Sequence, residues 1–307
     1  MKKIFIDGYA GTTGLKIYER LTPRKDIQLL TLTEETRKDI NARRDALNSA
    51  DIAFLCLPDD AAKESVSLVE NPNTAIIDTS TAHRVNPDWI YGLPELKGQR
   101  EKIAASKRIA NPGCHATGFI VLVAPLVQAG ILSRETLLSC FSLTGYSGGG
   151  KKMIAQYEAE GRDELLGAPR QYGLTQKHKH IPEMTKLCGL ENAPVFCPIV
   201  ADYFAGMEVT VPLHNVDVKA VQECYREYFG VEGIVHFTEA DTFDEGGFMS
   251  AGGFAGRDDL EVCVYGNDER AILVSRFDNL GKGASGAAIQ NMNILLGLEE
   301  SAGLSVK

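Results

Sequence analysis

The sequence predicts an α/β domain of Rossmann type with a parallel sheet, followed by an α+β domain with a mixed, largely antiparallel sheet. A glycine-rich turn joins the first predicted strand to the first predicted helix. The next strands are near-continuous apolar runs, a pattern typical of strands covered on both faces. Beyond residue 114 the strand candidates alternate between apolar and polar residues, which is typical of sheets with one solvated face.

The first strand is predicted from Lys3 to Asp7 and the first helix from Leu15 to Leu21. Between them lies a turn with the spacing GxxGxxG. Glycines let the backbone turn tightly and approach a pyrophosphate, and the helix N-terminus supplies N–H donors. The turn is therefore a candidate dinucleotide site formed by Gly8, Gly11, Thr12, Thr13 and Gly14. A tight βα turn without a ligand is the alternative.

The second strand is predicted at residues 27–32, and its end is where such a fold recognises the adenosine ribose. An acidic residue there suits a free 2′-hydroxyl, whereas an arginine or a hydroxyl suits a 2′-phosphate. The segment Thr33–Lys38 contains both kinds, so it leaves the choice of cofactor open. Further parallel strands are predicted within residues 51–58 and 74–80.

Cys114 stands between a tight turn and a predicted helix. Pro112 and Gly113 precede it, and the apolar run from Phe119 to Val127 follows. Converging N–H groups and the positive end of the helix dipole favour a thiolate here, so Cys114 is the candidate nucleophile. The other cysteines lie in apolar or mixed patterns typical of structural residues: Cys56, Cys140, Cys188, Cys197, Cys224 and Cys263.

Composition and charge exclude several classes of function. The 307 residues are enough for two domains, and 32 basic against 41 acidic residues give a net charge of −9. We therefore expect no nucleic-acid partner, and no apolar run is long enough to span a membrane. Seven cysteines without a CxxC pair argue against a disulfide framework and a zinc site. We expect no metal and a location in the reducing cytoplasm.

The second domain is predicted from alternating strands and two helices. The strand candidates are Leu137–Leu143, Glu208–Leu213, Gly233–Phe237, Leu260–Tyr265 and Ala271–Arg276, and the helices lie around Lys151–Glu160 and Val218–Phe229.

The loop from Tyr172 to Glu183 contains His178 and His180, two residues apart. Imidazole titrates near neutral pH and the Glu183 carboxylate can orient one ring, so the loop suits a general base for a cysteine nucleophile. A solvated basic loop is the alternative, which the presence of Cys114 disfavours.

Two further segments are suited to anionic groups of a substrate. Thr144–Lys152 follows a strand and offers small residues, free N–H groups and two lysines. Arg84 follows another predicted strand, and its guanidinium can bind a carboxylate or phosphate in bidentate geometry. A flexible, solvated loop is the alternative for each.

A dinucleotide-binding turn and an activated cysteine together point to redox chemistry through a thioester. The chain resembles the N-acetyl-γ-glutamyl-phosphate reductase family, in its shorter subtype, within the aspartate-semialdehyde dehydrogenase superfamily. The resemblance rests on the glycine turn, Tyr91-Gly92-Leu93-Pro94-Glu95-Leu96, Asn111-Pro112-Gly113-Cys114, His178-Lys179-His180-Ile181-Pro182-Glu183, Phe204-Ala205-Gly206-Met207, Asp278-Asn279-Leu280-Gly281-Lys282-Gly283-Ala284-Ser285-Gly286 and Gln290-Asn291-Met292-Asn293. The chain departs from the commoner wording at His115-Ala116, where the family has tyrosine and proline, and at Gly281.

The resemblance implies NADPH-dependent reductive dephosphorylation of N-acetyl-L-glutamyl 5-phosphate to the 5-semialdehyde, in arginine biosynthesis. Cys114 would attack the acyl phosphate, inorganic phosphate would leave, and NADPH would reduce the thioester. His178 would be the acid/base. Ser147, His180, Glu183 and Arg84 are then the expected substrate-binding residues, and Gly283 and Ser285 the expected neighbours of the nicotinamide.

The resemblance also implies a domain division and an assembly. Residues 1–114 with 283–307 would form the NADP-binding domain, and residues 115–282 would form the catalytic and oligomerisation domain. A homodimer or homotetramer is expected by analogy.

Two other functions remain open at this point. An aspartyl-phosphate or N-acetyl-aminoadipyl-phosphate reductase would keep the same cysteine and glycine turn. A non-catalytic redox sensor would bind a dinucleotide and oxidise Cys114 instead of acylating it. The sequence does not decide between His178 and His180 as the acid/base, nor which basic residue binds phosphate.

Overall fold

The chain folds into two units. The computed structural model describes residues 1–239 and 246–306, so residue 307 of the expected first domain lies outside the described residues. Unit 1 comprises Met1–Gly113 and Ala284–Leu304, and unit 2 comprises Cys114–Gly283 with the residues from Ser305. The division falls directly before the candidate nucleophile. Within the described ranges, none of the helices combines the length and apolar content needed to cross a membrane.

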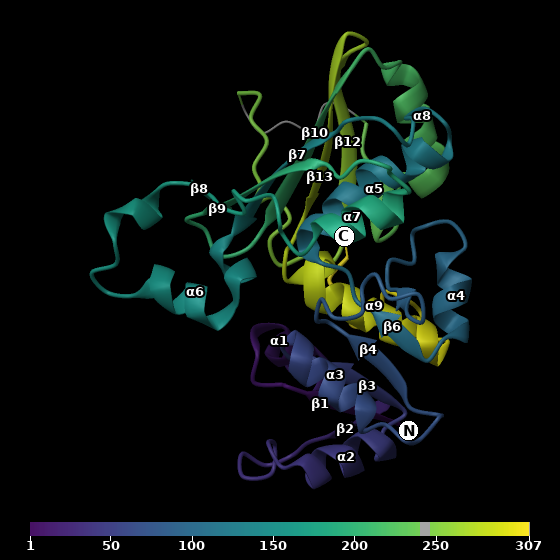
Figure 1. Cartoon of the computed structure of the whole chain (residues 1–307), viewed down its shortest axis with the longest axis vertical. Coiled ribbons are helices and arrows are strands. Elements are labelled where there is room, and N and C mark those ends of the chain that lie inside the picture. Colours follow the sequence, from purple (N-terminus) through teal and green to yellow (C-terminus); the bar gives the residue numbers. More distant parts are fainter. Residues whose placement is uncertain (240–245, 307) are drawn as a thin grey trace. The chain divides into compact units, whose positions relative to one another are not determined.

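Unit 1 is a parallel sheet with helices on both faces (Figure 1). Its strands are β1 (Lys2–Asp7), β2 (Ile27–Leu30), β3 (Ile52–Leu55), β4 (Ala75–Asp78), β5 (Ile90–Tyr91) and β6 (Arg108–Ala110), in the order β2-β1-β3-β4-β6-β5 with parallel pairings. Its helices are α1 (Thr12–Leu21), α2 (Ile40–Ser49), α3 (Asp59–Ser67), α4 (Gln99–Ala105) and α9 (Gly286–Leu296).

Successive residues of β1 serve two different cores. Ile4 and Ile6 belong to a buried cluster with residues of α1, α4 and α9. Phe5 belongs to a second cluster with residues of α2 and α3. A strand with both faces buried must be apolar at consecutive positions, which explains the continuous apolar runs of the sequence. The prediction of a Rossmann-type first domain is confirmed.

Helix α9 packs into the core of unit 1. All residues from Gly286 to Ile294 are buried. The polar ones form hydrogen bonds: Asn291 donates to the carbonyl of Gly92, and Gln290 donates to Glu95. Two of the family-like strings therefore meet in a buried polar network, which stabilises unit 1 because each polar atom that is paired avoids a desolvation cost.

Unit 2 contains a mixed sheet. Its strands are β7 (Ser139–Gly145), β8 (Arg170–Gln171), β9 (Val195–Ala201), β10 (Met207–His214), β11 (Val235–Phe237), β12 (Leu260–Asn267) and β13 (Arg270–Phe277), in the order β11-β12-β13-β10-β7-β9-β8. The β7–β9 and β11–β12 pairings are parallel and the others are antiparallel, so the predicted mixed, largely antiparallel sheet is confirmed.

The helices of unit 2 are α5 (Cys114–Gln128), α6 (Gly150–Glu158), α7 (Ile181–Cys188) and α8 (Val218–Phe229), with single turns η1 (Tyr146–Gly149), η2 (Glu164–Gly167) and η3 (Gly281–Ser285). Helix α5 is buried from His115 to Leu126 and packs against β10, β13, α7 and α8. Gly118 allows the close approach of α5 to the sheet, because an added Cβ would lie 2.4 Å from Val209 Cγ2.

Sequence reasoning missed two elements of unit 2 that lie beside the candidate site. Helix α7 begins directly after His180, and Pro182 occupies its first turn, where a missing N–H costs nothing. Strand β9 contains Pro198, which argues against an interior strand because proline cannot donate to a ladder. Here β9 pairs along its length with β7, while its other neighbour β8 is only two residues long.

We expect Gly118→Ala to lower the free energy of unfolding by about 1–3 kcal/mol, because the added methyl overpacks the contact between α5 and the sheet. Differential scanning calorimetry would measure the change. Gly167→Ala is the matched control in unit 2, since an added Cβ there meets no atom within 4 Å. Equal melting temperatures for both variants would contradict this account of the packing.

Candidate active site

The glycine turn of unit 1 has the backbone of a phosphate cradle. Gly8 has a φ of +85°, and an added Cβ would lie 2.4 Å from the carbonyl oxygen of Cys56. An added Cβ at Gly14 would lie 2.6 Å from the carbonyl oxygen of Gly8. Thr12 and Thr13 form the first turn of α1, whose N–H groups have no acceptor within the helix. The turn therefore fits a dinucleotide pyrophosphate.

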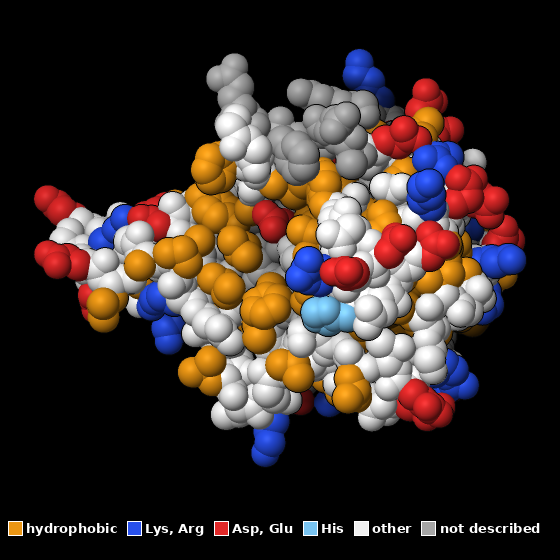
Figure 2. Space-filling model, turned by 90° about the horizontal axis from the view of Figure 1, so that it is seen from above, with side chains coloured by type: hydrophobic (Ala, Val, Ile, Leu, Met, Phe, Trp, Pro, Cys, Tyr) orange, Lys and Arg blue, Asp and Glu red, His pale blue; other side chains and the backbone are white. Residues whose placement is uncertain are grey.

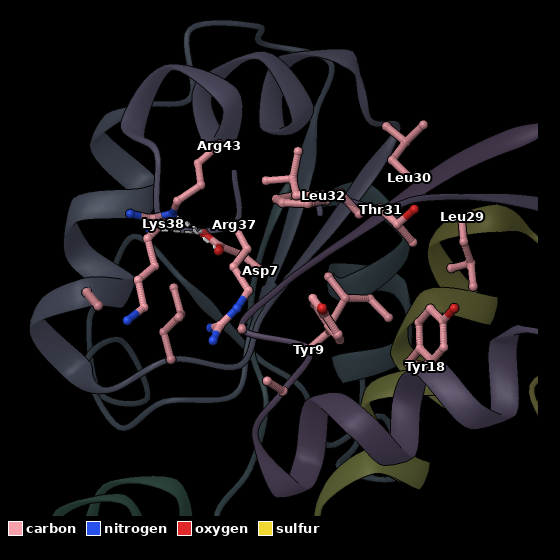
Figure 3. Close-up of a pocket in the computed structure, with 16 residues that line it drawn as sticks. Asp7, Tyr9, Tyr18, Leu29, Leu30, Thr31, Leu32, Arg37, Lys38 and Arg43 are labelled. Carbon is pink, nitrogen blue, oxygen red and sulfur yellow. Dashed lines mark hydrogen bonds and ion pairs between the residues drawn. The ribbon is translucent and has the colours of Figure 1, made fainter. Parts of the chain in front are cut away.

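A cavity of about 250 Å³ adjoins this turn (Figure 3). Most of its wall is apolar, and Arg37 and Lys38, from the segment after β2, also line it. A third basic residue, Arg43, is held by Asp7, Glu64 and Ser65. The cavity fits an adenosine with apolar walls for the base and two cations for a phosphate.

Cys114 is the first residue of α5 and is partly exposed. Gly283 lies against it, since an added Cβ at Gly283 would be 2.9 Å from Cys114 Cβ. Burial raises the pKa of Cys56 to about 12 and raises the pKa of Cys140 and Cys188 as well. These thiols are held in the protonated form, which favours Cys114 as the nucleophile.

Three imidazoles and two aromatic rings gather in unit 2. The ring centroids of His178 and His180 are 4.7 Å apart, and that of His115 lies 5.9 Å from the first and 5.5 Å from the second. Tyr172 and Phe196 lie 5.8 and 5.1 Å from His178. The two histidines predicted from the loop before α7 thus lie beside His115, the residue that follows the candidate nucleophile.

The hydrogen bonds distinguish the two predicted histidines. His178 Nδ1 accepts from the backbone N–H of His180 at 3.2 Å, so the neutral ring carries its proton on Nε2. His180 Nε2 lies 3.9 Å from Glu183 Oε1, and both side chains are buried. Across residues 1–239 and 246–306, no group of three or more His, Cys, Asp and Glu side chains is arranged to hold a metal ion.

His115 belongs to the site although the sequence marked it only as a departure from the family wording. Its Nδ1 lies 2.6 Å from Ser142 Oγ, and its Nε2 lies 2.7 Å from the phenol oxygen of Tyr172. Burial, with an added effect of His178, lowers the pKa of His115 to about 3. Burial and then the charge of Cys114 raise the pKa of Tyr172. His115 is therefore neutral, and Tyr172 keeps its proton, across the neutral pH range.

The segment after β7 differs from its expectation. Ser147 is buried in η1, and its Oγ accepts from Asn279 Nδ2 at 2.9 Å. The backbone N–H groups of Gly145, Tyr146 and Ser147 donate to carbonyls of residues 203–206. The expectation of free N–H groups there was wrong, because this turn is braced by the chain that leads into β10.

Arg84 lies in unit 1, where it joins two backbone segments. Its Nε donates to the carbonyl of Asn111 at 3.0 Å, and one terminal nitrogen donates to the carbonyl of Thr79 at 3.1 Å. The structure thus places Arg84 beside the ends of β4 and β6. Ser285, the other expected residue of the closing turn, is buried.

Known families match both units. The model described as "Semialdehyde dehydrogenase, NAD binding domain" matches residues 3–106, and "Semialdehyde dehydrogenase, dimerisation domain" matches residues 114–279. Fold and site thus define a protein of the semialdehyde dehydrogenase class, with a dinucleotide-binding unit and a second unit that begins at the cysteine.

Relatives of nearly the same length narrow this class. An N-acetyl-γ-glutamyl-phosphate reductase 2 of Nostoc sp. is 44% identical over 319 residues, covering 98% of this chain and 99% of that protein. An N-acetyl-γ-glutamyl-phosphate reductase of Brucella anthropi is 47% identical over 306 residues, covering 96% of this chain and 98% of that protein. The chain belongs to the N-acetyl-γ-glutamyl-phosphate reductase family.

Solved structures share the fold at low sequence identity. Aspartate semialdehyde dehydrogenase II from Vibrio cholerae has a TM-score of 0.74 at 16% identity, covering 96% of this chain and 98% of that one. Aspartate semialdehyde dehydrogenase with NADP from Candida albicans has a TM-score of 0.67 at 16% identity, with the same coverages.

The depressed pKa of His115 makes unit 2 sensitive to acid. Below pH 6.5 this imidazole binds a proton in the unfolded chain, whereas in the folded chain it stays neutral down to about pH 3. Its contribution to the free energy of unfolding is therefore complete above pH 6.5 and decreases as the pH falls. When the pH is lowered from 8 to 5, we expect the free energy of unfolding to fall by about 2 kcal/mol less in His115→Gln than in wild type. Urea unfolding followed by circular dichroism would measure this.

The exposed His214 supplies the control for that measurement. His214→Gln should follow the wild-type pH dependence. A His115→Gln variant that loses as much stability as wild type on acidification would show that His115 is protonated in the folded chain.

Proposed function

We propose that the chain is an NADPH-dependent reductase that converts N-acetyl-L-glutamyl 5-phosphate to N-acetyl-L-glutamate 5-semialdehyde and inorganic phosphate, in arginine biosynthesis. The observation that supports this best is the partly exposed Cys114 at the start of a buried helix, beside a histidine cluster and in one chain with a dinucleotide turn. The names of the relatives support the identity of the substrate.

Cys114 carries the covalent step of the proposed reaction. Its thiolate adds to the acyl carbon, the bond between that carbon and the phosphate oxygen breaks, and inorganic phosphate leaves with the proton it needs. NADPH supplies the hydride that reduces the resulting thioester. The first-turn N–H groups of α5 stabilise the oxyanion at each tetrahedral stage, and the carbon–sulfur bond then breaks to release the aldehyde and the thiolate.

His178 is the proposed acid/base, ranked above His180 because its orientation is fixed. The His180 amide occupies Nδ1, so Nε2 presents the proton to the oxygen that becomes charged. His180, directly before α7, and Glu183, within α7, are the proposed substrate ligands, and Ser147 in η1 is a third. Arg84 is the proposed ligand for an anionic group, and its hydrogen bonds to the carbonyls of Thr79 and Asn111 orient its guanidinium.

Unit 1 is the proposed NADP-binding domain. Gly8, Gly11 and Gly14 would cradle the pyrophosphate, and the N–H groups of Thr12 and Thr13 would bind it. Arg37 is the proposed ligand of the 2′-phosphate because it lines the cavity beside the glycine turn, and it would exchange its ion pair with Glu34 for the phosphate. Gly283 and Ser285 are proposed to lie near the nicotinamide.

Unit 2 is the proposed catalytic and oligomerisation domain. Figure 2 shows a surface of the molecule on which hydrophobic side chains gather in adjoining groups. By strand register, Phe141, Val195 and Ile272 share the sheet face opposite α5, and they are 43%, 55% and 40% exposed. Such a face fits a second copy of the chain, as a homodimer or as half of a homotetramer.

We expect the purified protein to reduce NADP⁺ with N-acetyl-L-glutamate 5-semialdehyde in the presence of phosphate, but not with aspartate semialdehyde. Cys114→Ser should lose this activity, because the hydroxyl cannot form the thioester at neutral pH, while NADP⁺ binding is retained. Absorbance at the nicotinamide band follows the reaction. Normal turnover by the variant would refute the thioester route, and activity with aspartate semialdehyde alone would refute the substrate.

We expect Arg37→Ala to weaken NADP⁺ binding roughly 10- to 100-fold, the usual effect of losing a charge-assisted hydrogen bond, and to leave NAD⁺ binding unchanged. Isothermal titration calorimetry separates the two affinities. Lys16→Ala, on the exposed surface of α1, serves as a control for a general loss of positive charge. Equal weakening of NADP⁺ and NAD⁺ binding would show that Arg37 does not bind the 2′-phosphate.

We expect Phe141→Glu to dissociate the oligomer, because a charge would be buried at the centre of the exposed sheet face. Light scattering after size-exclusion chromatography would report the mass. Val231→Glu, at a residue that is 60% exposed and lies outside the sheet, is the control. An unchanged mass for Phe141→Glu would move the interface to another surface.

A further inference from the structure

The neutral ring of His115 lies between two hydroxyl groups and carries a single N–H, which it can donate to only one of them. Its Nδ1 is 2.6 Å from Ser142 Oγ on β7, and its Nε2 is 2.7 Å from the Tyr172 oxygen that follows β8. Both hydroxyls can donate or accept, whereas a neutral imidazole donates from only one nitrogen. Two proton arrangements are therefore open to this row of three side chains.

In the first arrangement Ser142 donates to Nδ1, the ring donates from Nε2 to the Tyr172 oxygen, and the phenol proton points away from His115. In the second, Tyr172 donates to Nε2 and Nδ1 donates to Ser142. Cys114 is the neighbour of His115 at the start of α5, and its charge acts on the Tyr172 phenol, whose pKa it raises. A thiolate at Cys114 would therefore favour the first arrangement. A donor that faces a charged acceptor forms a hydrogen bond roughly twice as strong as one that faces a neutral ring.

We propose that His115 is a positioning residue that donates from Nε2 to Tyr172, so that the phenol O–H is directed at the sulfur of Cys114. This rests on the proposed function of Cys114 as nucleophile. Ser142 donates to Nδ1 in this arrangement, and burial keeps the ring neutral, so the ring does not gain a charge through the catalytic pH range. Tyr172 is then a second donor to the nucleophile, beside the amides of α5.

The titratable groups around this row come from several elements. His178 and His180 precede α7, Glu183 lies in α7, and the buried Lys282 lies in η3 next to Gly283, which touches Cys114. All of them are unchanged in the variants used below, so a shift in the titration of Cys114 reports the altered row.

Three substitutions test the role of the ring. His115→Phe keeps the packing and removes both hydrogen bonds, His115→Asn keeps a polar atom only near the Nδ1 position, and His115→Gln keeps a donor near the Nε2 position. We measure the pH dependence of iodoacetamide alkylation at Cys114 by peptide mass spectrometry, without substrate. We then measure kcat and KM with the semialdehyde, and the affinity for NADP⁺ as a check on folding.

The midpoint of alkylation should rise by about one pH unit in His115→Phe, His115→Asn and Tyr172→Phe, because the thiolate loses a donor. Their kcat should fall roughly 10- to 100-fold with KM little changed. His115→Gln should retain a larger share of both properties. The double variant His115→Phe, Tyr172→Phe should match Tyr172→Phe alone, since both changes remove the same hydrogen bond.

An alkylation midpoint in His115→Phe equal to that of wild type would overturn the proposal, as would a His115→Gln variant as impaired as His115→Phe. His214→Phe, on the exposed end of β10, controls for the loss of an imidazole as such. Because alkylation needs no substrate, this result is distinct from failure of the proposed function, which would appear as wild-type protein without reductase activity.

Discussion

The first turn of α5 is the constraint on which the site depends. Helix α5 is buried along nearly its whole length, and Gly118 brings it into close contact with the sheet. The packing of α5 therefore fixes the position of Cys114 relative to β7, β10 and β13. His115, one residue further, is carried to the inner face of the sheet, where Ser142 meets it. Core packing thus also preorganises the proposed nucleophile, so the cost of ordering it falls on folding and not on the reaction.

Close backbone contacts at glycines also shape the dinucleotide turn of unit 1, as Gly118 does for α5 in unit 2. Gly8 and Gly14 allow β1, α1 and the backbone at Cys56 to approach until no Cβ fits between them. That leaves backbone N–H groups as the surface presented to a ligand. The buried network of Asn291 and Gly92 lies near the edge strand β5, where hydrogen bonds fix the position of α9 more specifically than apolar packing alone.

Local patterns in the sequence were enough to predict most elements. Strand β1, helix α1 and helix α8 each carry their periodicity and their end signals within ten or so residues. Cys114 and His178 were also identifiable as candidate residues, because a turn before a helix and a paired histidine loop are local features. Ser142 and Tyr172 were not, since they lie 27 and 57 residues from His115 and only the sheet brings them together. Strand β9 was missed because Pro198 argues against a strand on local grounds. The proline is tolerated because the neighbouring strand β8 is short, which the local sequence does not show.

The imidazole cluster has a chemical logic of its own. Burial penalises charge on His115, so this ring is a neutral donor, and the His180 amide that donates to His178 leaves Nε2 as the proton-bearing nitrogen of the neutral His178 ring. An acyl phosphate already has a good leaving group, and its attack by a thiolate needs stabilisation of an oxyanion more than it needs a strong acid. A neutral donor in a site of low dielectric supplies that stabilisation without attracting the thiolate into a tight ion pair. Because the buried His115 is held neutral, acid destabilises the fold of unit 2.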